Sequence, residues 1–149
     1  MKASDHPIVV EQSFNATIDT VWRSITELDQ MKQWYFENIP SFKPEVGFET
    51  SFNVRSGERN FMHRWRVTEV VPLKRISYDW KYDSYPGDSY VVFELSEQGG
   101  VTTLRLTATV SEDFPDDIPE FKRESCIAGW QYFIKDRLKQ YIEGSMSGR

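Results

Sequence analysis

Side chains able to do acid–base or nucleophilic chemistry are few in this sequence. The chain has two histidines, His6 and His63, and one cysteine, Cys126. A Ser-His-Asp arrangement would have to be built on His63, because His6 lies close to the start of the chain. This set is too small for a His-rich or Cys-rich metal site, and no glycine-rich phosphate loop or paired-carboxylate motif is present. We therefore expect no catalytic residues, no metal and no cofactor.

His63 is the titratable residue of greatest interest. It alternates with Phe61 and Trp65 in a period-two run, which places it on the apolar side of a strand. A histidine in this position is either a core residue satisfied by one hydrogen bond or a polar anchor or acid–base group in a cavity. Both interpretations are open from the sequence.

Arg123 is the second polar candidate. On a helical projection it lies in line with Trp130 and Ile134. If the first turns of this helix overhang a cavity mouth, the guanidinium would be placed to bind a carboxylate or phosphate on a ligand. The alternative is an arginine that extends past the sheet edge into solvent. Cys126 lies on the same apolar face and is expected to be an inert buried thiol.

Aromatic side chains make up most of the remaining candidates. Phe, Tyr and Trp account for 15% of the residues, and each carries a large apolar area. The inward-facing aromatics either fill the core or line a pocket suited to a flat or apolar ligand. The predicted cavity lining consists of Trp34, Phe52, His63, Trp65, Tyr78, Trp80, Phe93, Leu106, Arg123, Trp130, Phe133 and Ile134.

Hydrophobic periodicity predicts the elements that would position these residues. Residues 117–144 are expected to form one long amphipathic helix, with an Asp117/Glu120 capping box at its start and Gly144 as its stop. Gly129 lies inside this helix, where glycine costs about 1 kcal/mol relative to alanine. A close approach by a strand or a ligand would explain it.

The residues before this helix alternate with the period of β-strands. A strand over 7–14 is followed by short helices over 17–26 and 29–34, and residues 36–45 are expected to be irregular. Five or six antiparallel strands then follow from residue 47 to residue 110. In the strand over 61–71, the odd positions through Val71 are expected to face inward. The predicted fold is a two-layer α+β domain, in which a twisted antiparallel sheet of six to seven strands wraps one long helix.

Length and charge restrict the class of protein. A chain of 149 residues is expected to form a single domain, 1–149, with a core over about 8–143 and mobile termini. A net charge of -5 and a pI of about 5.1 argue against nucleic acid or an anionic membrane surface as the main partner. The sequence has no secretory signal and no run of about 18 apolar residues. We expect a cytoplasmic protein with no membrane span.

One charged run has two interpretations. Arg55, Arg59, Arg64 and Arg66 lie close together in the strand region. Such a run is usually a solvated strand face, and the alternative is a small basic patch for an acidic protein partner.

Several short motifs together resemble one protein family. They are Phe14-Asn15-Ala16 with Val21-Trp22 downstream, the segment 31–34, Gly47 at a strand start, the run 67–72 ending in Pro72, Gly129-Trp130, and the segment 138–143. Their order and spacing, over about residues 8–143, resemble the Hsp90 ATPase activator homologue (Aha1-like) family of the START / Bet v 1-like (SRPBCC) superfamily. The resemblance implies a helix-grip fold with a cavity between the sheet and the C-terminal helix.

Three functions are compatible with these observations. The first is non-catalytic binding of a small hydrophobic or amphipathic molecule in the cavity. The second, implied by the resemblance alone, is an ATPase-activating interaction with an Hsp90-type chaperone. The third is a polyketide cyclase-like enzyme in which His63 acts as acid or base. A cavity of about 300 Å³ or more would favour ligand binding, and a filled interior would favour the chaperone interaction.

Overall fold

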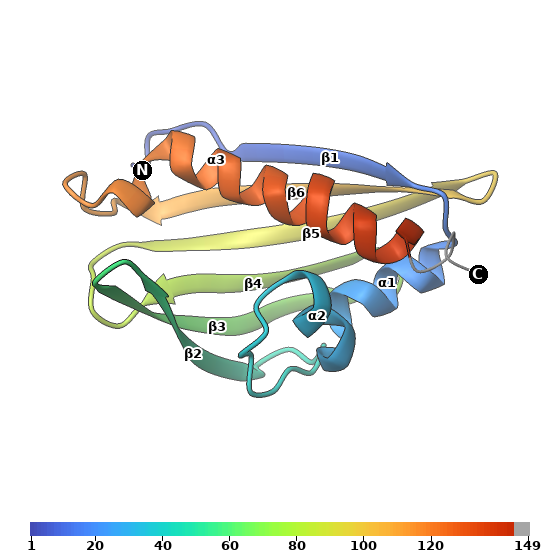
Figure 1. Cartoon of the computed structure of the whole chain (residues 1–149), viewed down its shortest axis with the longest axis horizontal. Coiled ribbons are helices and arrows are strands. Elements are labelled where there is room, and N and C mark those ends of the chain that lie inside the picture. Colours follow the sequence, from blue (N-terminus) through green and yellow to red (C-terminus); the bar gives the residue numbers. More distant parts are fainter. Residues whose placement is uncertain (145–149) are drawn as a thin grey trace.

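A curved six-stranded antiparallel sheet carries all the helices on one face (Figure 1). This computed structural model describes residues 1–144, and the C-terminal end that was expected to be mobile lies outside them. The strands are β1 (Ile8–Phe14), β2 (Glu49–Ser56), β3 (Arg59–Val71), β4 (Arg75–Tyr82), β5 (Asp88–Gln98) and β6 (Val101–Glu112). Their order is β1-β6-β5-β4-β3-β2, so β1 and β2 form the two edges.

The two short helices occupy the positions that the sequence predicts, and the C-terminal helix begins later than predicted. Two short helices, α1 (Ile18–Thr26) and α2 (Leu28–Trp34), follow the first strand. The long C-terminal helix consists of α3 (Arg123–Gln131) and wider π-helical turns over Tyr132–Leu138 and Gln140–Gly144. It runs along the concave side of the sheet, close to β1 and α2 (Figure 1). The predicted two-layer α+β architecture is confirmed. No helix within residues 1–144 is long and apolar enough to cross a membrane.

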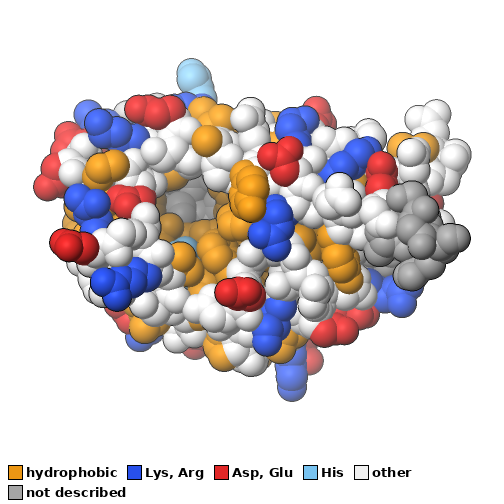
Figure 2. Space-filling model, viewed as in Figure 1, with side chains coloured by type: hydrophobic (Ala, Val, Ile, Leu, Met, Phe, Trp, Pro, Cys, Tyr) orange, Lys and Arg blue, Asp and Glu red, His pale blue; other side chains and the backbone are white. Residues whose placement is uncertain are grey.

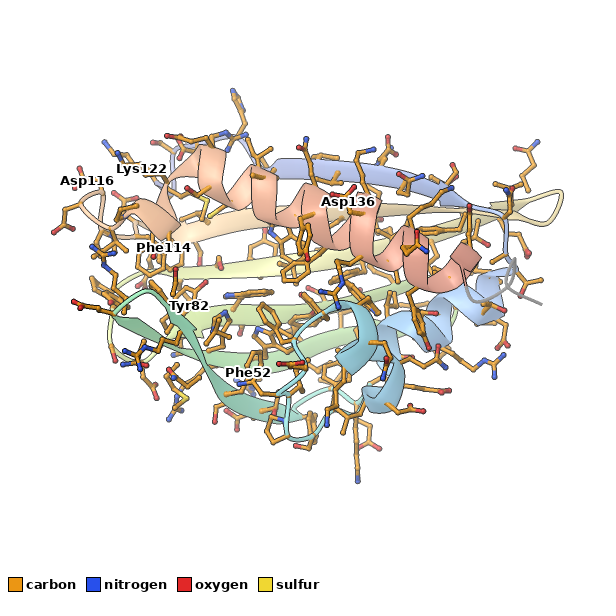
Figure 3. The ribbon with its side chains drawn as sticks, viewed as in Figure 1. Phe52, Tyr82, Phe114, Asp116, Lys122 and Asp136 are labelled. Carbon is orange, nitrogen blue, oxygen red and sulfur yellow. The ribbon has the colours of Figure 1, made fainter. Side chains whose placement is uncertain are left out.

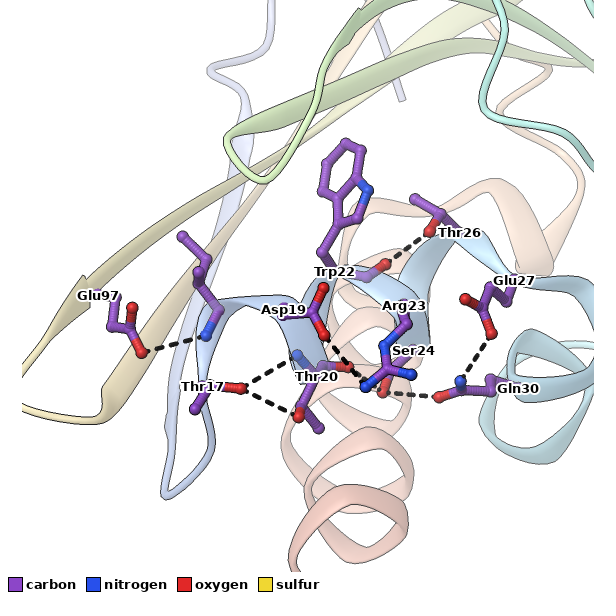
Figure 4. Close-up of polar contacts among 11 residues, drawn as sticks. Thr17, Asp19, Thr20, Trp22, Arg23, Ser24, Thr26, Glu27, Gln30 and Glu97 are labelled. Atoms are coloured by element: carbon purple, nitrogen blue, oxygen red, sulfur yellow. Dashed lines mark hydrogen bonds and ion pairs between the residues drawn. The ribbon is translucent and has the colours of Figure 1, made fainter.

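Thr17 caps the start of α1. The hydroxyl of Thr17 accepts a hydrogen bond from the backbone N–H of Thr20 at 3.3 Å, which satisfies one of the free donors at the helix start (Figure 4). Ser24 then joins α1 to α2, because its hydroxyl donates to Gln30 at 3.2 Å and its carbonyl accepts from the indole N–H of Trp34 at 2.7 Å. These bonds hold the two short helices against each other at one end of the sheet.

The predicted start of the C-terminal helix is wrong. The helix begins at Arg123 rather than Asp117, because Lys122 adopts an extended conformation that separates it from a short 3₁₀ turn over Pro119–Phe121. Glu120 does not complete a capping box. Its carboxylate accepts a hydrogen bond from the hydroxyl of Ser56 at 2.8 Å and ties the turn to the end of β2.

The predicted inward position of Val71 is also wrong. The pairing of β3 with β4 shifts register between Val67 and Glu69, which places an extra residue on β3. A bulge of this kind exchanges the two faces of the strand beyond it. Val70 therefore packs against the core, and the side chain of Val71 is 37% exposed.

The buried side chains form two separate clusters. The smaller cluster lies near the start of α3 and is built on Phe61, Phe114 and Phe121, with Tyr82 partly buried against it. Figure 3 shows Phe114 and Tyr82 at this end of the sheet. The larger cluster contains the remaining core, including the whole apolar face of the helix from Trp130 onward.

Candidate functional site

A cavity of about 190 Å³ lies between the two clusters, under the first turns of α3. Figure 2 shows a hollow with hydrophobic side chains on the face of the molecule that carries the helices. The helix contributes Arg123, Cys126, Gly129, Trp130 and Phe133, and the sheet contributes Ile8, His63, Trp80, Tyr82, Ser89, Val91, Ala108, Thr109 and Val110. Phe36, Phe114, Phe121 and the N-terminal residues Met1 and His6 complete the lining.

The cavity exists because small side chains face each other across the two layers. Cys126 and Gly129 face it from the helix, and Ala108 and Ser89 face it from the sheet. A Cβ atom added to Gly129 would have no atom within 4 Å, so no strand approaches closely at this position. The sequence suggested a close strand or a ligand as the reason for Gly129. The structure shows no close strand, and Gly129 borders open space.

His63 is a buried, neutral hydrogen-bond acceptor in the cavity wall. Its ring is 5% exposed and stacks on Phe52 at a centroid distance of 5.0 Å. Burial lowers the pKa of His63 to about 4, so the imidazole is uncharged at neutral pH. Its Nδ1 lies 2.9 Å from the carbonyl oxygen of Phe61. Because a carbonyl can only accept, Nδ1 carries the proton, and Nε2 is left as an acceptor with no partner among residues 1–144.

Tyr82 supplies the complementary donor. It pairs with His63 across β3 and β4, and the two rings meet edge to face at 4.8 Å. The indole N–H of Trp80 donates to the Tyr82 oxygen at 2.8 Å. Burial raises the pKa of Tyr82, so its phenol stays protonated at neutral pH. The phenol proton has no acceptor within the described part of the chain, and it is available to a molecule in the cavity.

Arg123 and Cys126 lie on the helix side of the cavity. The guanidinium of Arg123 donates to the carbonyl oxygen of His6 at 2.6 Å, which holds it near the N-terminal segment. Burial raises the pKa of Cys126 to about 11, so the thiol stays protonated, and it donates weakly to the carbonyl of Glu120 at 3.6 Å. An unreactive thiol agrees with the sequence interpretation of Cys126.

The predicted lining residues divide between the cavity and the packed core. Five of them border the cavity, and they are His63, Trp80, Arg123, Trp130 and Phe133. The other seven lie in the larger cluster away from it, and they are Trp34, Phe52, Trp65, Tyr78, Phe93, Leu106 and Ile134. Contact of any of these residues with a ligand stays a prediction.

Sequence reasoning did not select Tyr82 or the three phenylalanines that close the end of the cavity. The signal for Tyr82 was present, because it is the next inward position on its strand after Trp80. Phe114 lies in an irregular segment and Phe121 in the short 3₁₀ turn between β6 and α3, where periodicity gives no information about side-chain direction. Phe36 likewise follows the end of α2 in a turn.

Two of the four arginines in the strand run, Arg59 and Arg64, form ion pairs. Arg59 lies 3.6 Å from Glu120, and Arg64 forms an ion pair with Asp83. These pairs favour a solvated strand face over a basic patch for a partner. Within residues 1–144, no three His, Cys, Asp or Glu side chains are grouped so that they could hold a metal ion.

A curved antiparallel sheet wrapped around one C-terminal helix, with two short helices after the first strand and a cavity between the layers, defines a helix-grip protein of the SRPBCC type. Residues 15–143 match the family model described as Activator of Hsp90 ATPase homolog 1-like protein. The chain belongs to this family, and the predicted resemblance is confirmed.

Solved structures of bacterial proteins share the fold. A protein from Chromobacterium violaceum is 22% identical, with a TM-score of 0.77 over 93% of this chain and 97% of that one. A protein from Mesorhizobium loti is 25% identical, with a TM-score of 0.70 over 92% and 96%. The Aha1 dimer from Colwellia psychrerythraea is 20% identical, with a TM-score of 0.72 over 92% and 96%. No curated protein matches the sequence.

Proposed function

We propose that this protein binds one small, largely apolar molecule in the cavity under α3, without catalysis. The observation that supports this is a cavity lined by aromatic rings and by several small residues. Gly129 is the most informative of the small residues, because a Cβ atom added there would have no atom within 4 Å. The cavity opens to the surface, and a concave site lined mainly by apolar and aromatic side chains is typical of small-molecule binding.

The volume restricts the ligand to about one or two rings. An engineered apolar cavity of about 150 Å³ holds benzene, and sites for drug-sized ligands begin near 300 Å³. At about 190 Å³ the cavity falls between these limits, below the volume that a lipid or sterol needs. Trp80 and Trp130, whose ring centroids lie 5.4 Å apart, and Phe133 present aromatic surface to a flat molecule.

Native mass spectrometry and calorimetry against a panel of small aromatics, a fatty acid and a sterol test the proposal. We expect saturable binding of one equivalent of a one-ring or two-ring aromatic, and no binding of the sterol. The variant Gly129→Leu places a side chain in the open space at the cavity wall and should abolish binding. The matched control Ala128→Leu changes the exposed helix face and should bind normally. Absence of any binder, or unchanged binding by Gly129→Leu, would contradict the proposal.

A second candidate is stimulation of an Hsp90-type chaperone, and family membership supports it. Measurement of the chaperone's ATPase rate with and without this protein tests it, and an unchanged rate would remove it. A cyclase-like role for His63 has less support. An imidazole with a pKa of about 4 is a weak general base at neutral pH, where catalytic bases work best with a pKa near the ambient pH.

A further inference from the structure

We propose that the cavity selects a neutral ligand with a hydroxyl group, which donates its hydrogen to Nε2 of His63 and accepts one from the phenol of Tyr82. This inference rests on the proposed function, because it names the chemical class of molecule that the cavity takes. His63 on β3 and Tyr82 on β4 would together recognise the polar group of a ligand that is otherwise bound by apolar side chains.

The acceptor borders the cavity and has no protein partner among residues 1–144. Four rings pack around His63, those of Phe36, Phe52, Trp80 and Tyr82, with centroids between 4.8 and 5.4 Å from the imidazole. Within residues 1–144, none of them provides a hydrogen bond to Nε2, and Nδ1 already donates to the carbonyl of Phe61. An acceptor on a wall formed mainly by aromatic rings is poorly solvated, so a ligand that provides a donor gains affinity here.

The donor lies on the paired residue of the next strand. The oxygen of Tyr82 already accepts from Trp80, and this bond leaves the phenol hydrogen as the group that can reach a ligand. His63 and Tyr82 are register partners, so the free acceptor and the free donor enter the cavity from adjacent positions on the sheet. A hydroxyl group can donate to one and accept from the other at the same time.

A carboxylate does not suit this wall. Its oxygens can only accept, so they would meet the lone pair of Nε2 with no hydrogen between them. Tyr82 is the only ionisable group among the rings packed around His63, and it is neutral. The cationic groups of the cavity lining are the guanidinium of Arg123, which donates to the carbonyl of His6, and the amino group of Met1, which donates to the carbonyl of Phe121. An ether can accept from Tyr82 but has nothing to donate to His63.

Three ligands of matched size test this selectivity at pH 7 by calorimetry. They are 4-ethylphenol, its isomer 4-methylanisole, and 4-methylbenzoate. We expect 4-ethylphenol to bind about tenfold more tightly than 4-methylanisole, the effect of one hydrogen bond to a buried group. We expect 4-methylbenzoate to bind more weakly than either. This comparison uses the unmodified protein, so it does not depend on the folding of a variant.

Two substitutions assign the preference to His63. His63→Leu should bind 4-ethylphenol and 4-methylanisole equally, and His63→Gln, which keeps an acceptor oxygen, should retain part of the preference. Equal affinities in the unmodified protein, or a preference unchanged in His63→Leu, would overturn the inference and leave the proposed function standing, because the ligands would still bind. Absence of binding by all three ligands would overturn both.

Discussion

The two halves of the C-terminal helix lie on the same sheet and make opposite kinds of contact with it. Over the first half, Cys126 and Gly129 leave an open space above Ala108. Over the second half, Ile134 and Leu138 are fully buried in continuous packing. The sizes of the side chains that face the sheet therefore decide whether the interface encloses a cavity or a core.

The second half should carry more of the stability than the first. Leu138→Ala would remove a fully buried side chain from close packing and is expected to lower the free energy of unfolding by about 2–5 kcal/mol. Cys126→Ala removes a smaller group beside an existing void and should cost about 1 kcal/mol or less. Urea denaturation of both variants measures the difference. Equal losses would mean that the two halves are packed alike.

Acid should destabilise the protein through His63. Burial lowers its pKa from 6.5 to about 4 in the folded protein, so below pH 6.5 the unfolded chain binds the proton first. The free energy of unfolding should therefore fall as the pH is lowered from about 6.5 to about 4, by up to about 3 kcal/mol from this group.

Comparison with His63→Gln at pH 7 and pH 4.5 isolates this effect from other groups that titrate. The other ionisable side chains on the cavity wall are His6, Tyr82, Arg123 and Cys126, and both proteins contain them. The variant should lose less stability than the unmodified protein. Parallel losses in the two proteins would show that His63 is not buried and neutral.

Gly87 tests the closed end of the cavity. It has a φ of +112°, and a Cβ atom there would collide with the ring of Phe114, which lines the cavity. Gly87→Ala is expected to lower the free energy of unfolding by about 2 kcal/mol or more. Gly57 has a φ of +61° and open space around it, so Gly57→Ala should cost only about 1 kcal/mol. Thermal denaturation of the two variants separates the effect of the collision with Phe114 from the effect of backbone strain, which both variants share. Similar losses of stability in the two variants would argue against contact between Gly87 and Phe114.

The smallest expected effect is a gain of stability at Gly129. Gly129→Ala adds a methyl group where no atom lies within 4 Å, and alanine favours a helix by about 1 kcal/mol over glycine. The melting temperature should therefore rise. A decrease would show that the helix and the sheet meet more closely here than the structure indicates.

The hydrophobic periodicity of the sequence was sufficient to predict the strands and helices and most of the inward-facing side chains. It did not predict the bulge in β3 or the residue at which α3 begins. The alternation around His63 placed this residue on the concave side. Val71 was misplaced because a bulge follows Val67, and bulges have no period of their own. The helix start was misplaced because Lys122 is extended and separates α3 from the 3₁₀ turn, in which the carboxylate of Glu120 bonds to Ser56 on β2.

The cavity itself could be predicted only in part. Alternation indicates which side chains face inward, but not which of them border a void. Trp65 and Trp80 both face inward, and only Trp80 reaches the cavity, because the space depends on small residues that lie opposite it on other elements. Such pairings across the two layers are set by the curvature of the sheet and the path of the helix, which a single sequence does not reveal.

The most direct test of a cavity confined to the first half of the helix uses the five tryptophans as probes. In ¹⁵N-labelled protein titrated with 4-ethylphenol, the indole signals of Trp80 and Trp130 should shift and saturate, because both side chains line the cavity. The indole signals of Trp22, Trp34 and Trp65, which do not border the cavity, should stay in place. Shifts centred on Trp34 or Trp65, or no saturable shift at Trp80 and Trp130, would contradict a ligand site under α3.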